Sequence, residues 1–420
     1  MDAATGIRFD QLPSADGPRL FCFSHLRWGV VRQRPQHVAR LASQQNRVTY
    51  FEAPIFENGA RPALRVKDVS PRIQVATPVL PFGVSAPRAD ALQREMLDRL
   101  IGSVQRGRLT GWYYTPMAMR FSDHIAWDVC VYDCMEELSA FKDAPAHLLE
   151  MERCLLRRAD VVFTGGQSLY DAKRSLHRSV LHFPSSIDVT HFKQARSPGD
   201  DPADQAGIPH PRVGYFGFID ERLDIDLVAQ TARAMQDVHF VLIGPVVKID
   251  PASLAQNHNV HWLGAKSYDD LPDYLRHWKA GWMPFALNAA TRYTSPTETP
   301  AFLAAGLPVV STAIVDVVRS YGAAGLVEIV DDEDITTTLR RVLEQPQNPT
   351  LANVDAYLAD MSWMKTWAAM SGHVERAYAT KNVLPFRGKA AACASGWIGA
   401  RRLFSNLNTA NNNAVRPFIE

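Results

Sequence analysis

Hydroxyl-bearing residues gather just ahead of a short apolar segment in SPTETPAFLAAGLPVV, residues 295–310. If a helix begins here, Thr299 can cap it, and Pro300 suits its first position. The N-terminus of a helix has free N–H groups and partial positive charge, which favour a bound phosphate. Helix capping alone also explains Thr299 and Pro300, so both interpretations stay open for them. The candidate phosphate-binding residues of this run are Ser295, Thr297, Glu298 and Thr299.

A glycine-containing loop follows an apolar strand in GYFGFIDER, residues 214–222. Gly217 would let the backbone approach a diphosphate, and Arg222 can carry positive charge to it. The alternative is a glycine that serves only a tight turn. The segment lacks the G-x-G-x-x-G pattern, and no acidic residue follows at the expected distance, which argues against a nicotinamide or flavin site and so against a dehydrogenase.

Acidic residues stand just past a buried strand in VCVYDCMEELS, residues 129–139. A carboxylate at that position can take a proton from an acceptor hydroxyl or stabilise a developing positive sugar. The alternative is that Glu136 and Glu137 only favour the start of a helix. We predict Glu136 and Asp133 as candidate catalytic residues, together with His25 from the first loop of the chain.

That first loop, HLRWGVVRQRPQH, residues 25–37, combines arginines with histidine and tryptophan. Guanidinium groups suit the two-pronged recognition of an acidic or lipid-diphosphate acceptor. A solvated basic turn is the alternative. The candidate acceptor-binding residues are Trp28, Arg32, Arg34 and His37.

The elements that must position these residues are short apolar strands alternating with helices in both halves of the chain. This alternation predicts parallel sheets covered by helices on both faces. The pattern stops in a stretch rich in Pro, Asp and Gly and restarts at about residue 211. We therefore expect two Rossmann-like, doubly wound α/β domains. The predicted divisions are 1–195 as the first domain, 196–210 as a linker, 211–355 as the second domain, 356–381 as a crossing helix and 382–420 as a poorly ordered tail.

The overall composition is that of an ordinary globular protein of about two or three domains, with 420 residues, 46% hydrophobic and 21% charged. A net charge of +1 gives no bulk attraction for nucleic acid. The five cysteines contain no C-x-x-C pair, and we interpret them as reduced thiols. No signal peptide or membrane-spanning run is apparent. We expect a cytoplasmic protein; contact with the inner face of the membrane, through residues 401–405, is the alternative to a frayed tail.

Taken together, these motifs resemble the bacterial glycosyltransferases of GT-B fold related to retaining family four. The resemblance rests on segments that occur in the family's order between about residues 20 and 370: 24–28, 33–37, 132–139, 214–220, 242–245 and 295–312. It implies a nucleotide-diphosphate sugar, UDP- or GDP-linked, on the second domain and a glycan or lipid-linked acceptor on the first. It implies no organic cofactor and no obligatory metal, and we predict no metal ligands.

The resemblance also assigns roles to single residues. The helix with Trp363 and Trp367 would cross back onto the first domain. Glu136 takes the position of a catalytic Asp in xanthan-type glucuronosyltransferase relatives, with a side chain one methylene longer. The remaining donor-binding residues that we predict are Gly217, Asp220, Arg222, Gly244 and Gly264.

Two departures from the family pattern concern the donor site. Members of the wider family have two Glu separated by seven residues, where this chain has Tyr293 and Ala301. Closer relatives have Lys where this chain has Glu298 and Glu where it has Ala301. This exchange should weaken donor binding by about 1–3 kcal/mol unless a metal, Arg222 or Arg292 compensates. Alternatively, Glu298 itself reaches the ribose.

Three functions are consistent with the sequence. The first is a glycosyltransferase of cell-envelope or exopolysaccharide synthesis. The second is an inactive GT-B-like binding or scaffold subunit of a polysaccharide assembly system, which the two departures favour. The third is a nucleotide-sugar epimerase of the same fold, which would convert a donor without an acceptor.

Overall fold

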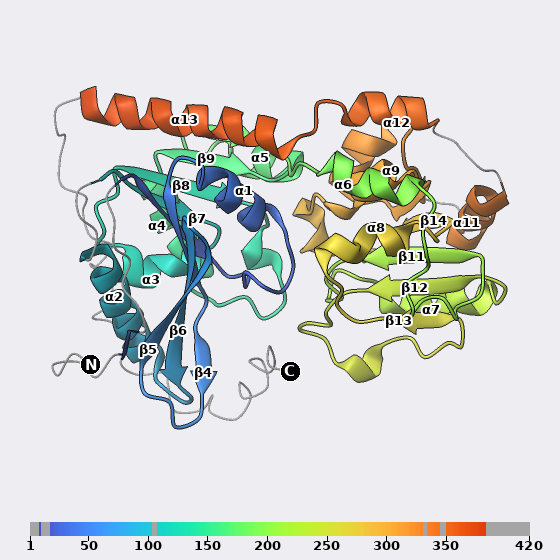
Figure 1. The fold of residues 1–420 in the computed structure, drawn as a ribbon, viewed down its shortest axis with the longest axis horizontal. Coiled ribbons are helices and arrows are strands. Elements are labelled where there is room, and N and C mark those ends of the chain that lie inside the picture. The colour runs from blue at the N-terminus through green and yellow to red at the C-terminus, as the bar shows by residue number, and fades with distance from the viewer. Residues whose placement is uncertain (1–7, 10–16, 103–106, 331–333, 345–349, 384–420) are drawn as a thin grey trace.

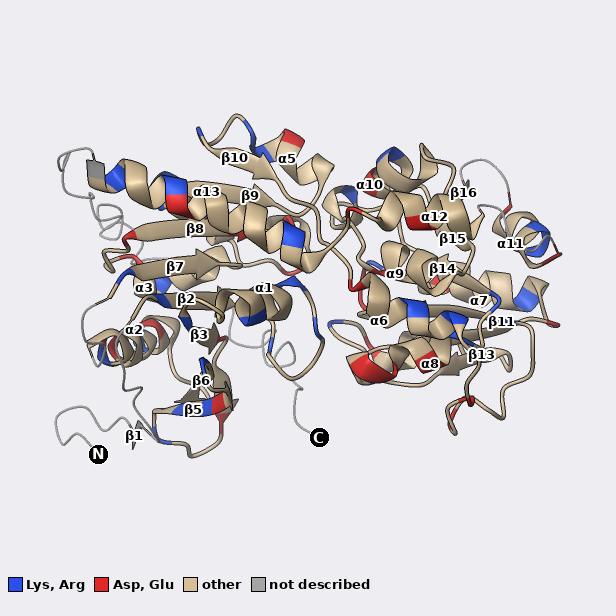
Figure 2. Ribbon diagram, turned by 45° about the horizontal axis from the view of Figure 1, so that its top comes forward, with Lys and Arg blue, Asp and Glu red and all other residues tan. Residues whose placement is uncertain are grey.

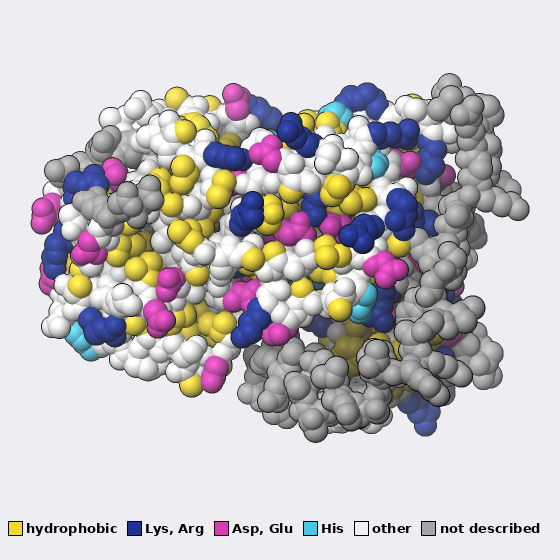
Figure 3. Space-filling view, turned by 180° about the vertical axis from the view of Figure 1, so that it is seen from behind, with side chains coloured by type: hydrophobic (Ala, Val, Ile, Leu, Met, Phe, Trp, Pro, Cys, Tyr) yellow, Lys and Arg dark blue, Asp and Glu magenta, His cyan; other side chains and the backbone are white. Residues whose placement is uncertain are grey.

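The computed structural model describes residues 8–9, 17–102, 107–330, 334–344 and 350–383. They form two α/β domains side by side, each built on its own sheet (Figure 1). Predictions for Cys393 and for residues 401–405 lie outside the described residues. Acidic and basic residues are distributed over both domains (Figure 2), in keeping with the near-zero net charge. On the face of the molecule opposite to that seen in Figure 1, apolar and charged side chains are interspersed (Figure 3).

The sheet of the first domain has the order β1-β5-β6-β3-β2-β7-β8-β9-β10, and β4 pairs with β6. Its pairings are parallel except for β5 with β6. The chain runs from β2 outward in both directions, so a switch point lies between β2 and β7. The strands are β1 Arg8–Phe9, β2 Arg19–Ser24, β3 Arg47–Glu52, β4 Ile55–Glu57, β5 Ala63–Ser70, β6 Ile73–Pro81, β7 Leu109–Tyr113, β8 Val129–Cys134, β9 Val161–Thr164 and β10 Val180–His182.

The second sheet has the order β13-β12-β11-β14-β15-β16, and its described pairings are all parallel. This is a doubly wound sheet with its switch point between β11 and β14. Its strands consist largely of buried apolar residues, as expected for strands covered on both faces. They are β11 Arg212–Phe216, β12 His239–Ile243, β13 Val260–Trp262, β14 Ala280–Met283, β15 Val309–Thr312 and β16 Glu328–Val330.

Helices cover both sheets. In the first domain they are α1 Arg34–Ala42, α2 Ala86–Gly102, α3 Met119–Ser122, α4 Leu148–Arg158 and α5 Gln167–Lys173. The chain then enters α6 Val189–Lys193. The second domain has α7 Ile225–Ala234, α8 Leu271–Leu275, α9 Glu298–Ala305, α10 Val315–Val317, α11 Ile335–Glu344 and α12 Leu351–Leu358.

The stretch predicted as one crossing helix from residue 356 is divided in the structure. Its first residues end α12 on the second domain, the helix is interrupted at residues 359–362, and α13 Trp363–Val383 lies along the first domain (Figure 1). Trp363 and Met370 are buried among side chains of the first domain, and Trp367 lies beside Trp112 with ring centroids 5.7 Å apart. The C-terminal part of the chain therefore ties the two domains together.

The segment predicted as a linker packs against the second domain. Gln205 and Ile208 are buried there, and Arg212 pairs with Asp201 at 2.6 Å. Arg196 donates hydrogen bonds to the Asp355 carboxylate and to the Ala304 carbonyl. The segment 196–210 therefore has few bulky apolar residues because polar contacts hold much of it on the second domain.

Candidate functional site

The loops that follow the central strands of the two sheets face each other across the domain boundary. Together with the N-terminus of α9 they line a cavity of about 510 Å³. This cavity brings together all four residues predicted for the acceptor and four of those predicted for the donor. They are Trp28, Arg32, Arg34 and His37 from the first domain, and Gly217, Gly244, Thr297 and Glu298 from the second. Ala301 also lines it.

Glycines at the strand ends form the backbone wall of this cavity. Gly217 and Gly244 have φ of 148° and 153°, a region that L side chains rarely adopt. The Gly217 N–H donates to the Ile243 carbonyl and the Gly244 N–H to the Gly264 carbonyl, each at 2.9 Å. A Cβ on Gly244 would overlap the Gly217 carbonyl oxygen. The ends of β11, β12 and β13 are thus joined by backbone alone, which leaves room for a ligand.

Arg222 joins the candidate donor and catalytic residues directly. Its Nη2 lies 2.7 Å from Oδ2 of Asp220, in its own loop, and its Nη1 lies 2.8 Å from Oε1 of Glu136 in the first domain. Burial alone would lower the pKa of Arg222, but Glu136 and Asp220 raise it above its ordinary value. The guanidinium also lies over the ring of Phe141, 5.5 Å from its centroid. The two residues that sequence reasoning selected from separate domains are therefore an ion pair.

His25 lies in the electrostatic reach of this pair. Its Nδ1 is buried and has no hydrogen-bond partner among the described residues. Burial lowers the pKa of His25, Glu136 opposes this, and Lys248 and Arg222 add to the lowering. The imidazole is therefore neutral at neutral pH. This is consistent with the predicted place of His25 near the chemistry, and its role stays a prediction.

Two residues at this boundary escaped the sequence analysis. Lys248, in the loop after β12, has a φ of 61°, and its Nζ lies 4.8 Å from the ring centroid of Phe141. Lys142, which follows Phe141 in the sequence, donates its backbone N–H to the Glu221 carboxylate of the second domain at 2.7 Å. A non-glycine residue held at positive φ is strained, and such strain is common at functional sites. The positive φ of Lys248 is visible only in the folded structure, so residue types and their spacing could not have identified this position.

Asp133 and Arg34 contact each other. They form an ion pair at 2.7 Å with side chains that are 0% and 1% exposed. Trp112 donates a further hydrogen bond to Asp133 at 3.2 Å, and Arg34 also donates to the Phe183 carbonyl and to the Met370 sulfur. Burial raises the pKa of Asp133, and Arg34 opposes the rise. This ion pair fixes α1 to β8. Arg34 also lines the cavity, whereas the buried Asp133 is not among the lining residues, and the roles predicted for the two residues stay predictions.

The predicted cap of α9 is wrong. The helix begins at Glu298, Thr297 occupies the N-cap position without a side-chain hydrogen bond, and Pro300 is its third residue. The Thr299 side chain is fully buried, and its Oγ1 has no hydrogen-bond partner among the described residues. Ser295 lies apart from this turn, against Gly166 of the first domain. Thr297 and Glu298 are therefore the residues of this run that reach the cavity.

Glu298 lies directly against the glycine loop. Its Oε1 is 2.7 Å from the point where a Cβ of Gly217 would stand. Burial raises the pKa of Glu298, a hydrogen bond from its own backbone N–H and then Arg222 lower it, and Glu136 and Asp220 raise it. The carboxyl group therefore occupies the corner between Gly217 and the first turn of α9.

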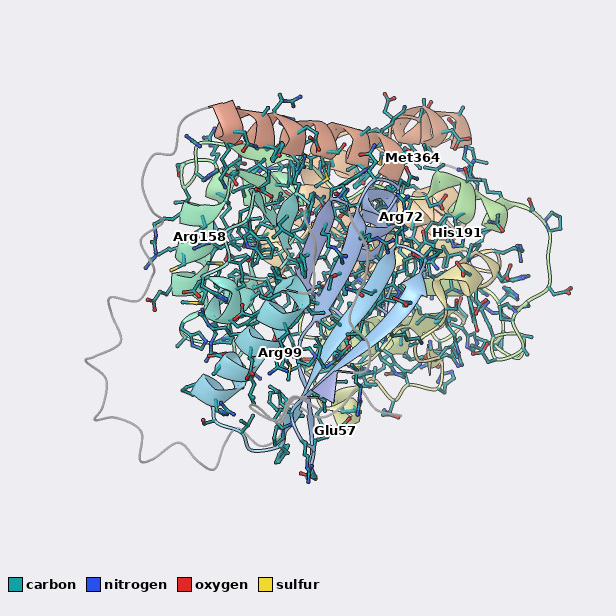
Figure 4. The ribbon with its side chains drawn as sticks, turned by 60° about the vertical axis from the view of Figure 1, so that its left-hand side comes forward. Glu57, Arg72, Arg99, Arg158, His191 and Met364 are labelled. Carbon is teal, nitrogen blue, oxygen red and sulfur yellow. The ribbon has the colours of Figure 1, made fainter. Side chains whose placement is uncertain are left out.

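Of the other predicted acceptor residues, Arg32 and His37 contact the second domain or α13, whereas Trp28 packs edge-on against Tyr50 of the first domain, with ring centroids 5.1 Å apart. Arg32 pairs with Asp269 at 3.0 Å and lies over Tyr268, 4.8 Å from the ring centroid. His37 stacks on Trp363 at 4.7 Å, and burial, with Arg32 next, lowers its pKa to about 4. His191 of α6 stacks on Tyr268 at 4.4 Å; it is labelled in Figure 4, as is Met364 at the start of α13. The rings of His37, Tyr268 and Trp363 line the cavity at the domain boundary.

Of the remaining predicted residues, Asp220 is buried and pairs with Arg222. Gly264 is not among the residues that line the cavity, but its carbonyl accepts a hydrogen bond from the N–H of Gly244, which does line it. Glu137 points away from the cavity and lies 2.5 Å from Lys173. It lines a larger cavity of about 890 Å³ beside α4 and α5, to which Glu152 and Lys173 also belong. The neighbouring residues Glu136 and Glu137 thus face opposite sides of one loop.

Among the described residues, no group of three or more His, Cys, Asp or Glu is placed to hold a metal ion. No helix in the described part of the chain is long and apolar enough to cross a membrane.

Comparison with known proteins adds a family match in the second domain. Residues 210–345 match the family described as Glycosyl transferases group 1. TuaH of Bacillus subtilis (strain 168), whose name describes it as a teichuronic acid biosynthesis glycosyltransferase, is 26% identical to this chain over 233 residues. That match covers 52% of this chain and spans 59% of the length of TuaH.

Solved structures share the whole two-domain arrangement. Sucrose-phosphate synthase from Thermosynechococcus elongatus superposes with a TM-score of 0.67 at 15% identity, covering 86% of this chain and all of that chain. WaaG, a glycosyltransferase involved in lipopolysaccharide biosynthesis, superposes with a TM-score of 0.60 at 13% identity, covering 85% and 99%. These findings confirm the predicted GT-B fold.

Proposed function

We propose that the protein is a glycosyltransferase that moves a sugar from a UDP- or GDP-linked donor to a polysaccharide or lipid-linked glycan acceptor. The observation that carries this proposal is the contact between Arg222 and Glu136, which unites the two domains at the facing ends of their sheets. Ligands of doubly wound sheets bind at such places. The roles named for TuaH and WaaG favour an acceptor of the cell envelope or an exopolysaccharide.

In this proposal the first turn of α9 holds the diphosphate of the donor, and Gly217 leaves room for it because it has no side chain. The bond between the sugar and the diphosphate breaks, a bond from the acceptor oxygen to the sugar forms in its place, and Arg222 stabilises the negative charge that the diphosphate gains. Glu136 either accepts the proton of the acceptor hydroxyl or stabilises positive charge on the sugar. Neither step requires an organic cofactor, and we propose that a metal is not obligatory.

The test is sugar transfer by Glu136→Gln and Arg222→Ala, measured by mass spectrometry with the donor that the wild type consumes. Removing a positioned acid or base, or a charge that stabilises the leaving group, should lower the rate on the order of 10²-fold or more. The control is Arg340→Ala, because Arg340 is an exposed arginine on α11 paired only with Asp237. Sugar transfer that is unchanged in both Glu136→Gln and Arg222→Ala would refute the proposal.

A second function, an inactive binding or scaffold subunit, is favoured by one observation. Ala301 lines the cavity where a carboxylate would bind the ribose, and Glu298 brings negative charge to the corner proposed for the diphosphate. Calorimetric titration with a panel of nucleotide sugars separates the two functions. An inactive scaffold would show no saturable heat with any donor, whereas an enzyme would bind at least one.

A further inference from the structure

Glu298 is the one carboxylate among the described residues that line the interdomain cavity. It is the first residue of α9, and its Oε1 lies against the backbone of Gly217. The N-terminus of α9 favours an anion there, because the first N–H groups of a helix have no partner within it, whereas the Gly217 N–H already donates to the Ile243 carbonyl. The position best suited to a phosphate oxygen therefore has an acidic side chain beside it.

The backbone N–H of Glu298 supports its ionised form, but the side chains around it supply little positive charge for it. Arg222 is the nearby cation, but its N–H groups already serve Asp220 of its own loop and Glu136 of the first domain. Tyr215 of β11 donates its hydroxyl to the Phe218 carbonyl, and burial keeps it neutral by raising its pKa well above the ordinary value. Three carboxyl groups thus share one guanidinium at this corner.

Farther out lie the neutral imidazole of His25 and the ammonium group of Lys248, which acts on that imidazole together with Glu136 and Arg222. Lys248 contacts the ring of Phe141 through its Nζ. Arg32, Arg40 and Lys266 also line the cavity, at the loops after β2 and β13 and on α1. An ionised Glu298 beside a diphosphate would place like charges together in a partly buried site, where water screens them weakly.

We propose that Glu298 takes up one proton from solvent when a nucleotide-diphosphate sugar binds, and that its neutral carboxyl group donates a hydrogen bond to a phosphate oxygen. No covalent bond forms or breaks in this step. The inference rests on the proposed function, and it explains how an acidic residue can stand where a cation is expected. The burial that raises the pKa of Glu298 in the free protein acts in the same direction.

The opposite arrangement gives the opposite dependence on pH. If an ionised Glu298 accepted hydrogen bonds from the ribose hydroxyls, affinity would fall as the pH is lowered through its pKa. If the neutral acid contacts phosphate, affinity is greatest at low pH and falls as the pH rises through the pKa.

The experiment is isothermal titration calorimetry of the full chain with UDP-glucose and with GDP-mannose, without acceptor, between about pH 5.5 and 9. The substituted diphosphate of these probes has no protonation step in that range, so its charge stays constant. Two buffers of different ionisation enthalpy at each pH count the protons bound. We expect uptake that approaches one proton, and a Kd that rises by up to about tenfold per pH unit above the pKa.

The matched variant is Glu298→Gln, which keeps the shape and stays neutral at every pH. It should bind with the low-pH affinity of the wild type over the whole range and take up no proton. Glu298→Ala is a second variant that should also lose the pH dependence, and thermal melting checks that both fold.

Several outcomes would overturn the inference and leave the proposed function standing. They are donor binding that is independent of pH, binding that weakens toward low pH, a pH dependence that persists in Glu298→Gln, and binding that requires added Mg²⁺ without proton uptake. The absence of saturable heat with either probe at every pH would overturn the inference, and if a wider donor panel also gave none, the proposed function as well.

Discussion

Arg222 contacts two carboxylates, one from each domain, at the boundary beside the cavity. Glu136 remains 28% exposed at the boundary, whereas Asp133, three positions earlier, is fully buried. Their difference follows from the strand that precedes them. Asp133 still belongs to β8, while Glu136 lies in the loop beyond it. The same short acidic motif therefore supplies one buried residue and one residue at the domain boundary.

We predict that Asp133→Asn destabilises the first domain by about 3–5 kcal/mol, because it leaves the Arg34 guanidinium buried without its counter-charge. Urea unfolding followed by tryptophan fluorescence measures this. Glu136→Gln is the control, and it should change the free energy of unfolding by less than about 1 kcal/mol because its ion pair is partly exposed. A stable Asp133→Asn protein that has lost sugar transfer would contradict this prediction and support the catalytic role of Asp133.

Residue identities and their neighbours along the chain sufficed to select Glu136, Arg222 and Glu298. They could not reveal that Arg34 and Asp133, which are 99 positions apart, pair with each other. Lys248 escaped detection for a similar reason, because only the fold brings its loop over Phe141. Residues that act through a distant partner have no local signal.

At the scale of elements, β11, β12 and β13 end together at glycines, and α9 begins beside them. The strands were predictable because buried parallel strands are short runs of apolar residues. Two strands that the analysis did not predict show the limit. β5 has only one buried residue, and β10 has only three residues, none of them buried. The interruption before α13 was likewise hidden inside a stretch with continuous helical spacing.

Gly244→Ala tests the role of the glycine ends. The substitution places a Cβ on the Gly217 carbonyl at a φ of 153°, so the loop must shift. We expect a loss of about 1–3 kcal/mol in the stability of the second domain, together with weaker binding of the donor. Thermal melting and donor titration check the two effects. Gly207→Ala is the control, because no atom lies within 4 Å of its added Cβ; equal effects of the two variants would contradict the assignment.

The contact of α1 with α13 should weaken in acid. His37, stacked on Trp363, has a pKa of about 4 in the folded protein, below the ordinary value of 6.5. A base with a lowered folded pKa favours folding above its unfolded pKa, and this contribution is lost as the pH falls from about 6.5 toward 4.

The expected loss is on the order of 1–3 kcal/mol, and the measurement is urea unfolding at several pH values. The comparison is His37→Gln, which cannot titrate. The difference in stability between wild type and variant should shrink as the pH falls; a difference that stays constant from pH 7 to pH 4 would rule out this role of His37.

At the scale of the whole molecule, the two domains are held in contact at several points around the cavity. Asp316 of the second domain accepts hydrogen bonds from the backbone N–H and the hydroxyl of Ser168, at 3.0 and 2.5 Å, at the start of α5. Arg319 pairs with Asp171 nearby at 2.9 Å. The GT-B architecture followed from the repeated strand and helix pattern, but these contacts between domains depend on docking geometry that the sequence does not display.

Asp316→Ala should loosen this junction. Because Asp316 is buried, its loss leaves the Ser168 N–H and hydroxyl without partners, which costs about 1–3 kcal/mol. Hydrogen exchange at α5 should accelerate and the free energy of unfolding should fall. Asp171→Ala removes an exposed ion pair at the same junction and should change stability by less than about 1 kcal/mol. Equal protection of α5 in wild type and Asp316→Ala would show that the contact is unimportant.

The central claim is that the cavity between the domains binds and uses a nucleotide-diphosphate sugar. Mass spectrometry of a panel of UDP- and GDP-linked sugars incubated with the protein tests it most directly, with Arg222→Ala measured in parallel. The account predicts that the wild type consumes at least one donor and that Arg222→Ala consumes that donor on the order of 10²-fold more slowly. Consumption of no donor by the wild type, or equal consumption by wild type and Arg222→Ala, would contradict it.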